Sequence, residues 1–263
     1  MMRESGLNTV VNLRDLGGLP AAGGGAVRPG LFLRSAALNR LSARDARTLS
    51  ERYRVRAVID LRTGTERGEK PDRLLPGARY YHIPIFSEAT MGVTHEKGMD
   101  RREALDHLPD LGGLYEKMVT DPFCTSQLRA VFALLTDGAP GAALFHCTAG
   151  KDRAGTVAAL LLTLLGAPAE AVRADYLRSN AALKRTAERY YRLVLLLSRN
   201  KETAMRVKTL YSADAAMLSR LFGAIDRAYG GFEAFRRDAL GVTDDALSAL
   251  KNRAVVRPTR RLK

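Results

Sequence analysis

Apolar residues along this chain fall into short runs that alternate with helical repeats, and the alternation predicts the fold class. Short runs rich in β-branched or aromatic residues, which are typical of buried strands, occur at 55–62, 80–85 and 142–145. Residues 41–53 and 125–137 have helical periodicity, and Ser42 stands three positions before Asp45 in a capping-box arrangement. We therefore expect an α/β fold with a largely parallel central sheet flanked by helices.

The rest of the pattern bounds the domain organisation. Glycine and proline at 19–30 predict a turn or hairpin, and nearly everything after Arg153 predicts helix. Residues 86–113 are polar and aperiodic, and because so long a connector is unusual in a compact domain we expect a mobile loop or lid there. No internal repeat is visible. We expect one domain over 1–263 with additional C-terminal helices.

The stretch LFHCTAGKDRAGT, 144–156, places Cys147 between an apolar run and a glycine-rich, charged turn. If a strand precedes this turn and a helix follows it, the backbone N–H groups of 148–153 point inward at the positive end of the helix, where anions bind. Gly150 allows backbone angles that a Cβ would resist. Arg153 presents a planar fork that matches two phosphate oxygens. The loop is predicted to cradle a tetrahedral dianion through Thr148, Ala149, Gly150, Lys151, Asp152 and Arg153.

A thiol must ionise before it can attack, and an unperturbed thiol is only a few per cent thiolate at pH 7. Lowering its pKa by about 3 units takes about 4 kcal/mol, more than a helix dipole supplies. We expect the loop amides and Arg153 to share this work, with His146 orienting the loop by hydrogen bonding to its backbone. A buried, inert thiol is the alternative, and we favour it for Cys124. The sequence does not match a nucleotide-binding P-loop, because Phe145 stands where that motif requires glycine and Asp152 where it requires Ser or Thr.

Composition narrows the partners and the compartment. The net charge of +14 favours anionic partners such as phosphorylated substrates, nucleic acid or anionic membrane surfaces. No nucleic-acid-binding motif is present, so we expect no nucleic acid. Two cysteines and four histidines argue against a disulfide scaffold or a zinc cluster, and we expect no metal and no cofactor. Without a signal peptide or membrane-length apolar run, we expect a cytoplasmic protein, with unconventional export left open.

His-Cys, five residues and then Arg is the signature of the cysteine-dependent protein tyrosine phosphatase superfamily. From about Asn12 to Val256 the chain resembles the atypical bacterial tyrosine and phosphoinositide phosphatases, similar to the secreted enzymes of mycobacteria and Listeria. The motifs that carry this resemblance are HCTAGKDRAG, NLRDLGG at 12–18, LRSA at 33–36, DLRTGTE at 60–66, ADYLRSN at 174–180 and YGGFEAFRRDALGV at 229–242. The resemblance implies that the Cys147 thiolate takes the phosphoryl group, that Arg153 and the loop amides hold its oxygens, and that water then hydrolyses the thiophosphate.

The chain departs from the superfamily pattern at two places. Where relatives carry a proton-donating aspartate after an Ile-Pro strand, this sequence has Phe86, Ser87 and Glu88. Three replacements are candidates, in the order Asp152, Asp60 and Glu88, although Asp152 and Asp60 could instead form ion pairs that position Arg153 or Arg14. Many members also have Ser or Thr after the arginine, whereas this chain has Ala154, so Thr148 or Thr156 would have to assist the departing thiolate or phosphoenzyme breakdown would slow.

Substrate contacts are predicted from position and resemblance. Lys151 stands where the phosphatase and tensin homologue, a lipid phosphatase, has lysine, and it would add charge for a multiply phosphorylated head group or remain a solvent-facing lysine. The resemblance further implies that Arg14 and Asp15 shape the pocket rim and that Arg14 and Arg62 contact the substrate. It also implies a helical lid at 181–210, whose basic charge suits a membrane surface, and 257–263 is expected to be a basic tail.

The sequence therefore predicts a cysteine phosphatase acting on phosphotyrosine, with phosphoserine, phosphothreonine and phosphoinositides as further substrates. The missing loop aspartate and Ala154 leave one alternative, a catalytically weak phosphate- or phosphoinositide-binding module on the same fold.

Overall fold

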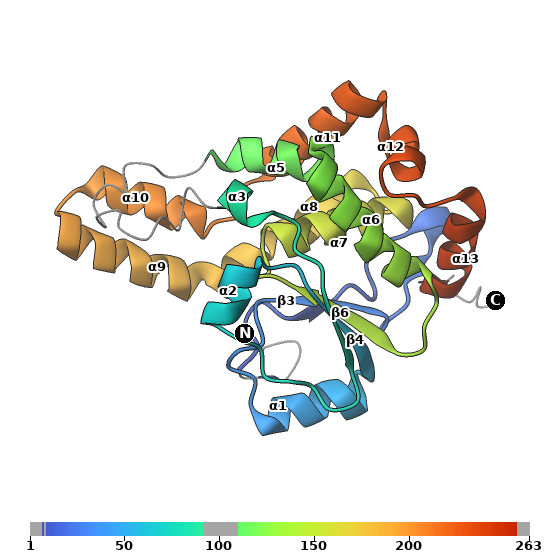
Figure 1. The fold of residues 1–263 in the computed structure, drawn as a ribbon, viewed down its shortest axis with the longest axis horizontal. Coiled ribbons are helices and arrows are strands. Elements are labelled where there is room, and N and C mark those ends of the chain that lie inside the picture. The colour runs from blue at the N-terminus through green and yellow to red at the C-terminus, as the bar shows by residue number, and fades with distance from the viewer. Residues whose placement is uncertain (1–6, 8, 92–109, 257–263) are drawn as a thin grey trace, which may run out of the picture.

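The computed structural model describes residues 7, 9–91 and 110–256, and its centre is a five-stranded sheet of order β1-β3-β6-β4-β5 (Figure 1). Strands β3, β6, β4 and β5 run parallel, and β1 pairs antiparallel with β3 at one edge. A separate two-stranded antiparallel sheet joins β2 to β7. The strands are β1 (Arg14–Asp15), β2 (Ala26–Val27), β3 (Phe32–Ser35), β4 (Val55–Asp60), β5 (Arg79–His82), β6 (Ala142–His146) and β7 (Val255–Val256). The predicted α/β class with a largely parallel sheet is confirmed.

Helices cover both faces of this sheet, with most of them on one side (Figure 1). The α-helices are α1 (Ala43–Arg47), α2 (Gly64–Glu69), α3 (Glu88–Met91), α5 (Leu111–Thr120), α6 (Pro122–Thr136), α7 (Arg153–Leu164), α8 (Ala169–Leu177), α9 (Ser179–Ser198), α10 (Lys201–Leu210), α11 (Ala215–Tyr229), α12 (Phe232–Asp238) and α13 (Asp244–Ala254). A 3-10 helix, η1 (Ala22–Gly24), and a π-helical turn, η2 (Thr48–Arg52), complete the set. None of the described helices is both long and apolar enough to traverse a bilayer.

Alternation along the strands divides the core in two. Ile59 and Phe145 face the larger core, together with α6 and α7, whereas their neighbours Val58 and Leu144 face the smaller core beside α1 and η2. Side chains of a strand alternate between the two faces of a sheet, so both faces of these central strands are buried and the runs are apolar throughout. Helix α7 is buried on nearly every side, which fixes the residue that opens it.

The predicted strands and helices are present, and short elements were missed. Strand β3 overlaps the LRSA motif and is four residues long, which is too short for a periodicity to be seen. The predicted loop or lid at 86–113 has a short helix, α3, at its start, and 92–109 lie outside the described residues. The predicted basic tail at 257–263 also lies outside them.

Candidate active site

The loop between β6 and α7 lies at the carboxyl ends of the parallel strands, the usual place for ligand sites in open α/β sheets. Cys147 follows the last residue of β6, and Arg153 is the first residue of α7. Both side chains are largely covered, with 2% of Cys147 and 7% of Arg153 exposed. The expected strand-loop-helix context of the cysteine is therefore present.

The peptide carbonyls of 148–151 all accept hydrogen bonds from residues outside the loop. The carbonyl of Thr148 accepts from the Ala37 amide at 3.3 Å. Asn12 Nδ2 donates to the carbonyls of 149 and 150 at 3.1 and 3.0 Å, and Arg34 Nη2 donates to those of 150 and 151 at 2.8 and 3.2 Å. In a planar trans peptide the N–H points opposite to the C=O. The amides of 149–152 are therefore directed toward the concave side of the loop, as an anion site requires.

Gly150 allows the loop to turn at this place. Its φ is +68°, and a Cβ built there would lie 2.4 Å from the carbonyl carbon and oxygen of Ser35. A side chain would therefore be strained by the backbone angle and would also collide with β3.

A buried ion-pair network holds the two side chains that anchor the loop. Asp175 of α8 binds Arg14 Nε at 2.6 Å and Arg34 Nη1 at 2.7 Å, and Arg14 donates to Asn12 Oδ1 at 2.6 Å. Burial, together with the neighbouring Arg34, lowers the pKa of Arg14 to about 10. Burial would raise the pKa of Asp175, but the two guanidinium groups outweigh it and lower that pKa. Arg14 thus lies behind the loop, which corrects its predicted place at the pocket rim.

Asp15 also has a structural position. Its carboxylate accepts from the backbone amides of Gly17 at 2.8 Å and Gly30 at 2.7 Å, and so ties together the turn that follows β1. It contacts neither Cys147 nor Arg153 through these bonds. The prediction that Asp15 shapes the rim therefore has no support in its contacts.

Glu66 of α2 holds the guanidinium of Arg153. Its two carboxylate oxygens lie 2.5 Å from Arg153 Nη1 and 2.7 Å from Nη2, and the Thr148 hydroxyl donates to Glu66 Oε1 at 2.5 Å. Burial alone would raise the pKa of Glu66, but hydrogen bonds and charge from Arg153, with a bond from Thr148, lower it to about 2. Glu66 is therefore ionised at neutral pH and cannot itself donate a proton to a leaving group.

Arg153 is correspondingly held in its charged form. Burial opposes the charge, but the hydrogen bonds to Glu66 and the proximity of Cys147 and Glu66 raise the pKa of Arg153 above its usual value. For the other cysteine, Cys124, burial and the nearby Asp121 raise the pKa of the thiol to about 12.

Asp152, the first candidate for proton donor, lies within the loop and keeps 32% of its side chain exposed. Its Oδ1 accepts a hydrogen bond from the Tyr115 hydroxyl at 2.7 Å and lies 3.1 Å from Lys151 Nζ. Tyr115 is in turn 2.7 Å from the hydroxyl of Tyr176. Burial and the charge of Asp152 keep the pKa of Tyr115 well above its usual value, so its phenol remains a neutral donor to the carboxylate.

Lys151 does not project into solvent at the mouth of the loop. It is 1% exposed, and its ammonium donates to the carbonyl of Leu210, the last residue of α10, at 2.8 Å and to that of Ser212 at 3.0 Å. The predicted solvent-facing alternative is therefore wrong for this conformation. In the structure the lysine links the loop to the base of the α9–α10 helices.

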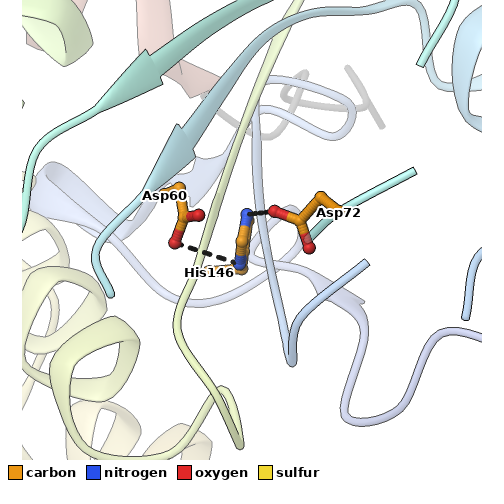
Figure 2. Close-up of side chains that lie close together, drawn as sticks. All are labelled: Asp60, Asp72 and His146. Carbon is orange, nitrogen blue, oxygen red and sulfur yellow. Dashed lines mark ion pairs between the residues drawn. The ribbon is translucent and has the colours of Figure 1, made fainter. Parts of the chain in front are cut away.

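Asp60, the second candidate, belongs to a cluster with Asp72 and His146 (Figure 2), to which Arg62 also binds. Arg62 binds Asp60 Oδ2 at 2.7 Å and Asp72 Oδ2 at 2.8 Å, and His146 Nε2 lies 3.1 Å from the same Asp72 oxygen. Asp60 thus forms the predicted alternative, an ion pair, but with Arg62 rather than with Arg14. Arg62 is 1% exposed and cannot reach a substrate without leaving this cluster.

The same cluster contains the contacts of His146 and a set of possible metal ligands. The His146 ring faces the two aspartates rather than the backbone of the loop, which corrects its predicted hydrogen bond (Figure 2). Ligand atoms of Asp60, Asp72 and His146 lie within 4.8 Å of one another, but Arg62 donates to both carboxylates. A metal ion there would meet that cation and oxygens already bonded, so we assign these residues a structural role.

The remaining candidates have other partners. Glu88 Oε1 accepts from the Thr65 amide at 3.1 Å, and its hydrogen bonds to Thr65 lower its pKa, which disfavours proton donation. Of the two hydroxyls expected to compensate for Ala154, Thr148 donates to Glu66, and Thr156 Oγ1 is buried without a hydrogen-bond partner among the described residues.

Several residues of the site were missed by sequence reasoning, and the signals differ. Glu66 was present in the quoted DLRTGTE motif, where Thr63 and Glu66 form a capping box that opens α2. Arg34 and Asp175 also fall in quoted motifs, but their pairing spans 141 positions and no local pattern reveals it. Tyr115 follows a stretch expected to be a loop, and its contact with Asp152 gave no sequence signal.

The chain is similar in sequence to known phosphatases. A protein of Cupriavidus necator, whose name places it among tyrosine-protein phosphatases, is 33% identical over 238 residues, covering 89% of this chain and 83% of its own length. The triple specificity protein phosphatase PtpB of Mycobacterium tuberculosis is 28% identical over 256 residues, covering 86% and 91%. The crystal structure of P. aeruginosa TpbA aligns over 81% of this chain and 91% of its own, with 18% identity and a TM-score of 0.30. The model of the tyrosine phosphatase family matches residues 5–256. This chain belongs to the tyrosine phosphatase family, whose members are phosphoric monoester hydrolases.

Proposed function

We propose that this phosphatase works through a covalent intermediate on Cys147. The thiolate attacks phosphorus, an S–P bond forms, and the P–O bond to the leaving group breaks as its oxygen takes a proton from Asp152, which enters this step in its protonated form. Water then attacks the phosphocysteine and gives a proton back to Asp152. The S–P bond breaks, and inorganic phosphate and the thiolate are regenerated.

The observation that carries this mechanism is the hydrogen bonding of the loop carbonyls to Ala37, Asn12 and Arg34, outside the loop. It directs the loop amides to one point, at the N-terminus of α7, where they would hold the equatorial oxygens of the phosphoryl group. Arg153 adds the Nε–H edge of its guanidinium, since Glu66 occupies the two terminal nitrogens. Glu66 would thereby orient the arginine for a phosphate on its other side.

Asp152 is the proton donor that the contacts favour. It lies in the loop itself and is partly exposed, whereas Asp60 is buried against Arg62 and the pKa of Glu88 is lowered. The Tyr115 hydroxyl fixes the direction of the Asp152 carboxylate. The proton is used in the first step and recovered in the second, so one carboxyl group serves both.

For substrates we propose phosphotyrosine first, with phosphoserine, phosphothreonine and phosphoinositides as further classes. The name of the relative PtpB describes a triple specificity phosphatase. The positive charge of the chain also favours multiply phosphorylated substrates. Lys151 is the residue that would add charge for such a head group, after its ammonium leaves the carbonyls of Leu210 and Ser212.

The mechanism is tested by rapid acid quench with a radiolabelled phosphopeptide. The parent protein should carry label on a cysteine, Cys147→Ser should show neither label nor turnover, and Cys124→Ser should resemble the parent. Turnover by Cys147→Ser equal to that of the parent would contradict the proposal. Binding of the phosphopeptide without turnover by the parent would instead favour the binding-module alternative.

The role of Asp152 is tested through the leaving group. Asp152→Asn should reduce kcat about 100-fold or more for a phenyl phosphate with a poor leaving group, and less for p-nitrophenyl phosphate, because a good leaving group needs less protonation. The conservative Asp152→Glu should recover part of the loss. Equal losses for both substrates would assign Asp152 a structural role.

A further inference from the structure

Helices α9 and α10 form a hairpin that projects from the body of the molecule (Figure 1). Its own small core consists of Val194, Ala204 and Val207. On its outer surface, toward the turn at Arg199 that joins the two helices, four large apolar side chains are uncovered. They are Leu193 (45% exposed), Leu196 (76%), Leu197 (60%) and Met205 (45%). Isolated exposed apolar residues are common, but a group of them at one end of a hairpin marks an interaction surface.

The hairpin as a whole is cationic. Residues 179–210 contain eight Lys and Arg against two Glu. Two of the arginines, Arg192 and Arg199, are exposed and line an open cavity of about 460 Å³ together with Leu195 and Leu196. Two guanidinium groups thus flank two leucines on one open surface. This combination is complementary to a ligand that has negative charge next to hydrocarbon.

An anionic bilayer surface fits this patch better than a folded partner. A stable protein interface uses about 20–30 residues on each side, and the uncovered apolar side chains here are four. A bilayer requires no shape complementarity, since each apolar side chain that enters the acyl boundary contributes separately and nearby cations bind the lipid phosphates. The spacing of Leu193, Leu196 and Leu197 puts them on one side of α9, as an interfacial helix requires.

We propose that the free end of the α9–α10 hairpin docks on an anionic membrane surface. Leu193, Leu196 and Leu197 enter the acyl boundary, and Arg192 and Arg199 lie at the level of the phosphates. This docking does not depend on the chemistry of Cys147. The base of the hairpin accepts hydrogen bonds from Lys151, so the docked hairpin is attached directly to the catalytic loop.

Docking is measured by flotation of the whole protein with vesicles of phosphatidylcholine, with and without phosphatidylserine. The parent should float with the mixed vesicles and remain behind with phosphatidylcholine alone. The double change Leu196→Ser and Leu197→Ser should weaken binding at least about tenfold, because two leucines lose their burial in the acyl region. The matched control is Leu74→Ser, which alters a leucine that is 75% exposed outside the hairpin and should bind as the parent does.

Charge is tested separately. Arg192→Gln with Arg199→Gln should lose most binding to mixed vesicles, whereas Arg44→Gln with Arg47→Gln, which removes two exposed arginines of α1, should lose much less. Added salt should weaken binding by the parent. Cys147→Ser should float like the parent, so failure of docking and failure of the proposed chemistry can be told apart.

Turnover of p-nitrophenyl phosphate, a soluble substrate, should be unchanged in the leucine and arginine variants, which shows that they fold. Equal flotation of the parent and of both hairpin variants would overturn the proposal. So would binding to phosphatidylcholine alone that matches the mixed vesicles. A change from dimer to monomer in the leucine variant, with flotation unaffected, would assign the patch to a second copy of the chain instead.

Discussion

Replacing Glu66 by glutamine should destabilise the protein by about 3 kcal/mol at neutral pH. The pKa of Glu66 is lowered from 4.5 to about 2, and each pKa unit corresponds to about 1.36 kcal/mol. Burial works against the carboxylate, but Arg153 and Thr148 more than compensate for it. The Glu66 side chain is 12% exposed, so water screens the pair only weakly. Removing the charge also leaves Arg153 buried without its partner, which is costly in itself.

The effect should depend on pH in a defined direction. Because the pKa of Glu66 is lower in the folded state, its contribution is complete above about pH 4.5 and is lost as the pH falls toward about 2. Glutamine does not titrate. The difference in unfolding free energy between the parent and Glu66→Gln should therefore be largest near pH 7 and should shrink steadily below about pH 4.5.

Urea unfolding of both proteins at pH 7 and at about pH 3 measures this difference, and the other carboxylates cancel in the comparison. Glu188→Gln is the matched control, because Glu188 pairs with Lys208 at the surface of the hairpin and its loss should have a small effect at either pH. An equal penalty for Glu66→Gln at both values of pH would refute the electrostatic argument. A penalty below about 1 kcal/mol at pH 7 would do the same.

Three further outcomes follow from the geometry of the site. Gly150→Ala should lower kcat/KM about 100-fold, since the added Cβ would lie 2.4 Å from the Ser35 carbonyl and displace the loop, and unchanged kinetics would contradict this account. Asp175→Asn should cost about 3–5 kcal/mol in urea unfolding at pH 7, because two buried arginines lose their counter-charge, and the loss should diminish in acid since the pKa of Asp175 is lowered in the fold. At pH 7 iodoacetamide should label Cys147 and leave Cys124 intact, since the Cys124 pKa is about 12, and peptide mapping that finds label on Cys124 first would count against it.

Local features of the site could be predicted from the sequence, and long-range ones could not. The strand before Cys147, the glycine in the turn and the arginine at the start of the helix lie close together in the sequence. Spacing and propensity therefore suffice to place them. The Arg34–Asp175 pair depends on how β3 and α8 pack, which a single sequence does not encode locally. The same limit explains Arg14, for which the family resemblance implied a substrate contact, whereas its buried guanidinium binds Asp175.

The catalytic loop is consequently held by residues that would not touch the substrate. Four of its carbonyls point outward, and two of them, those of Gly150 and Lys151, belong to buried residues. Water cannot replace the donors of these two, Asn12 and Arg34. A donor lost from this set leaves a buried carbonyl without a partner and allows that peptide to rotate, which turns its N–H away from the phosphate. Asn12 and Arg34 should therefore affect kcat through the orientation of the amides. In this chain Asn12 and Arg34, although distant in sequence from Cys147, hold the direction of those N–H groups.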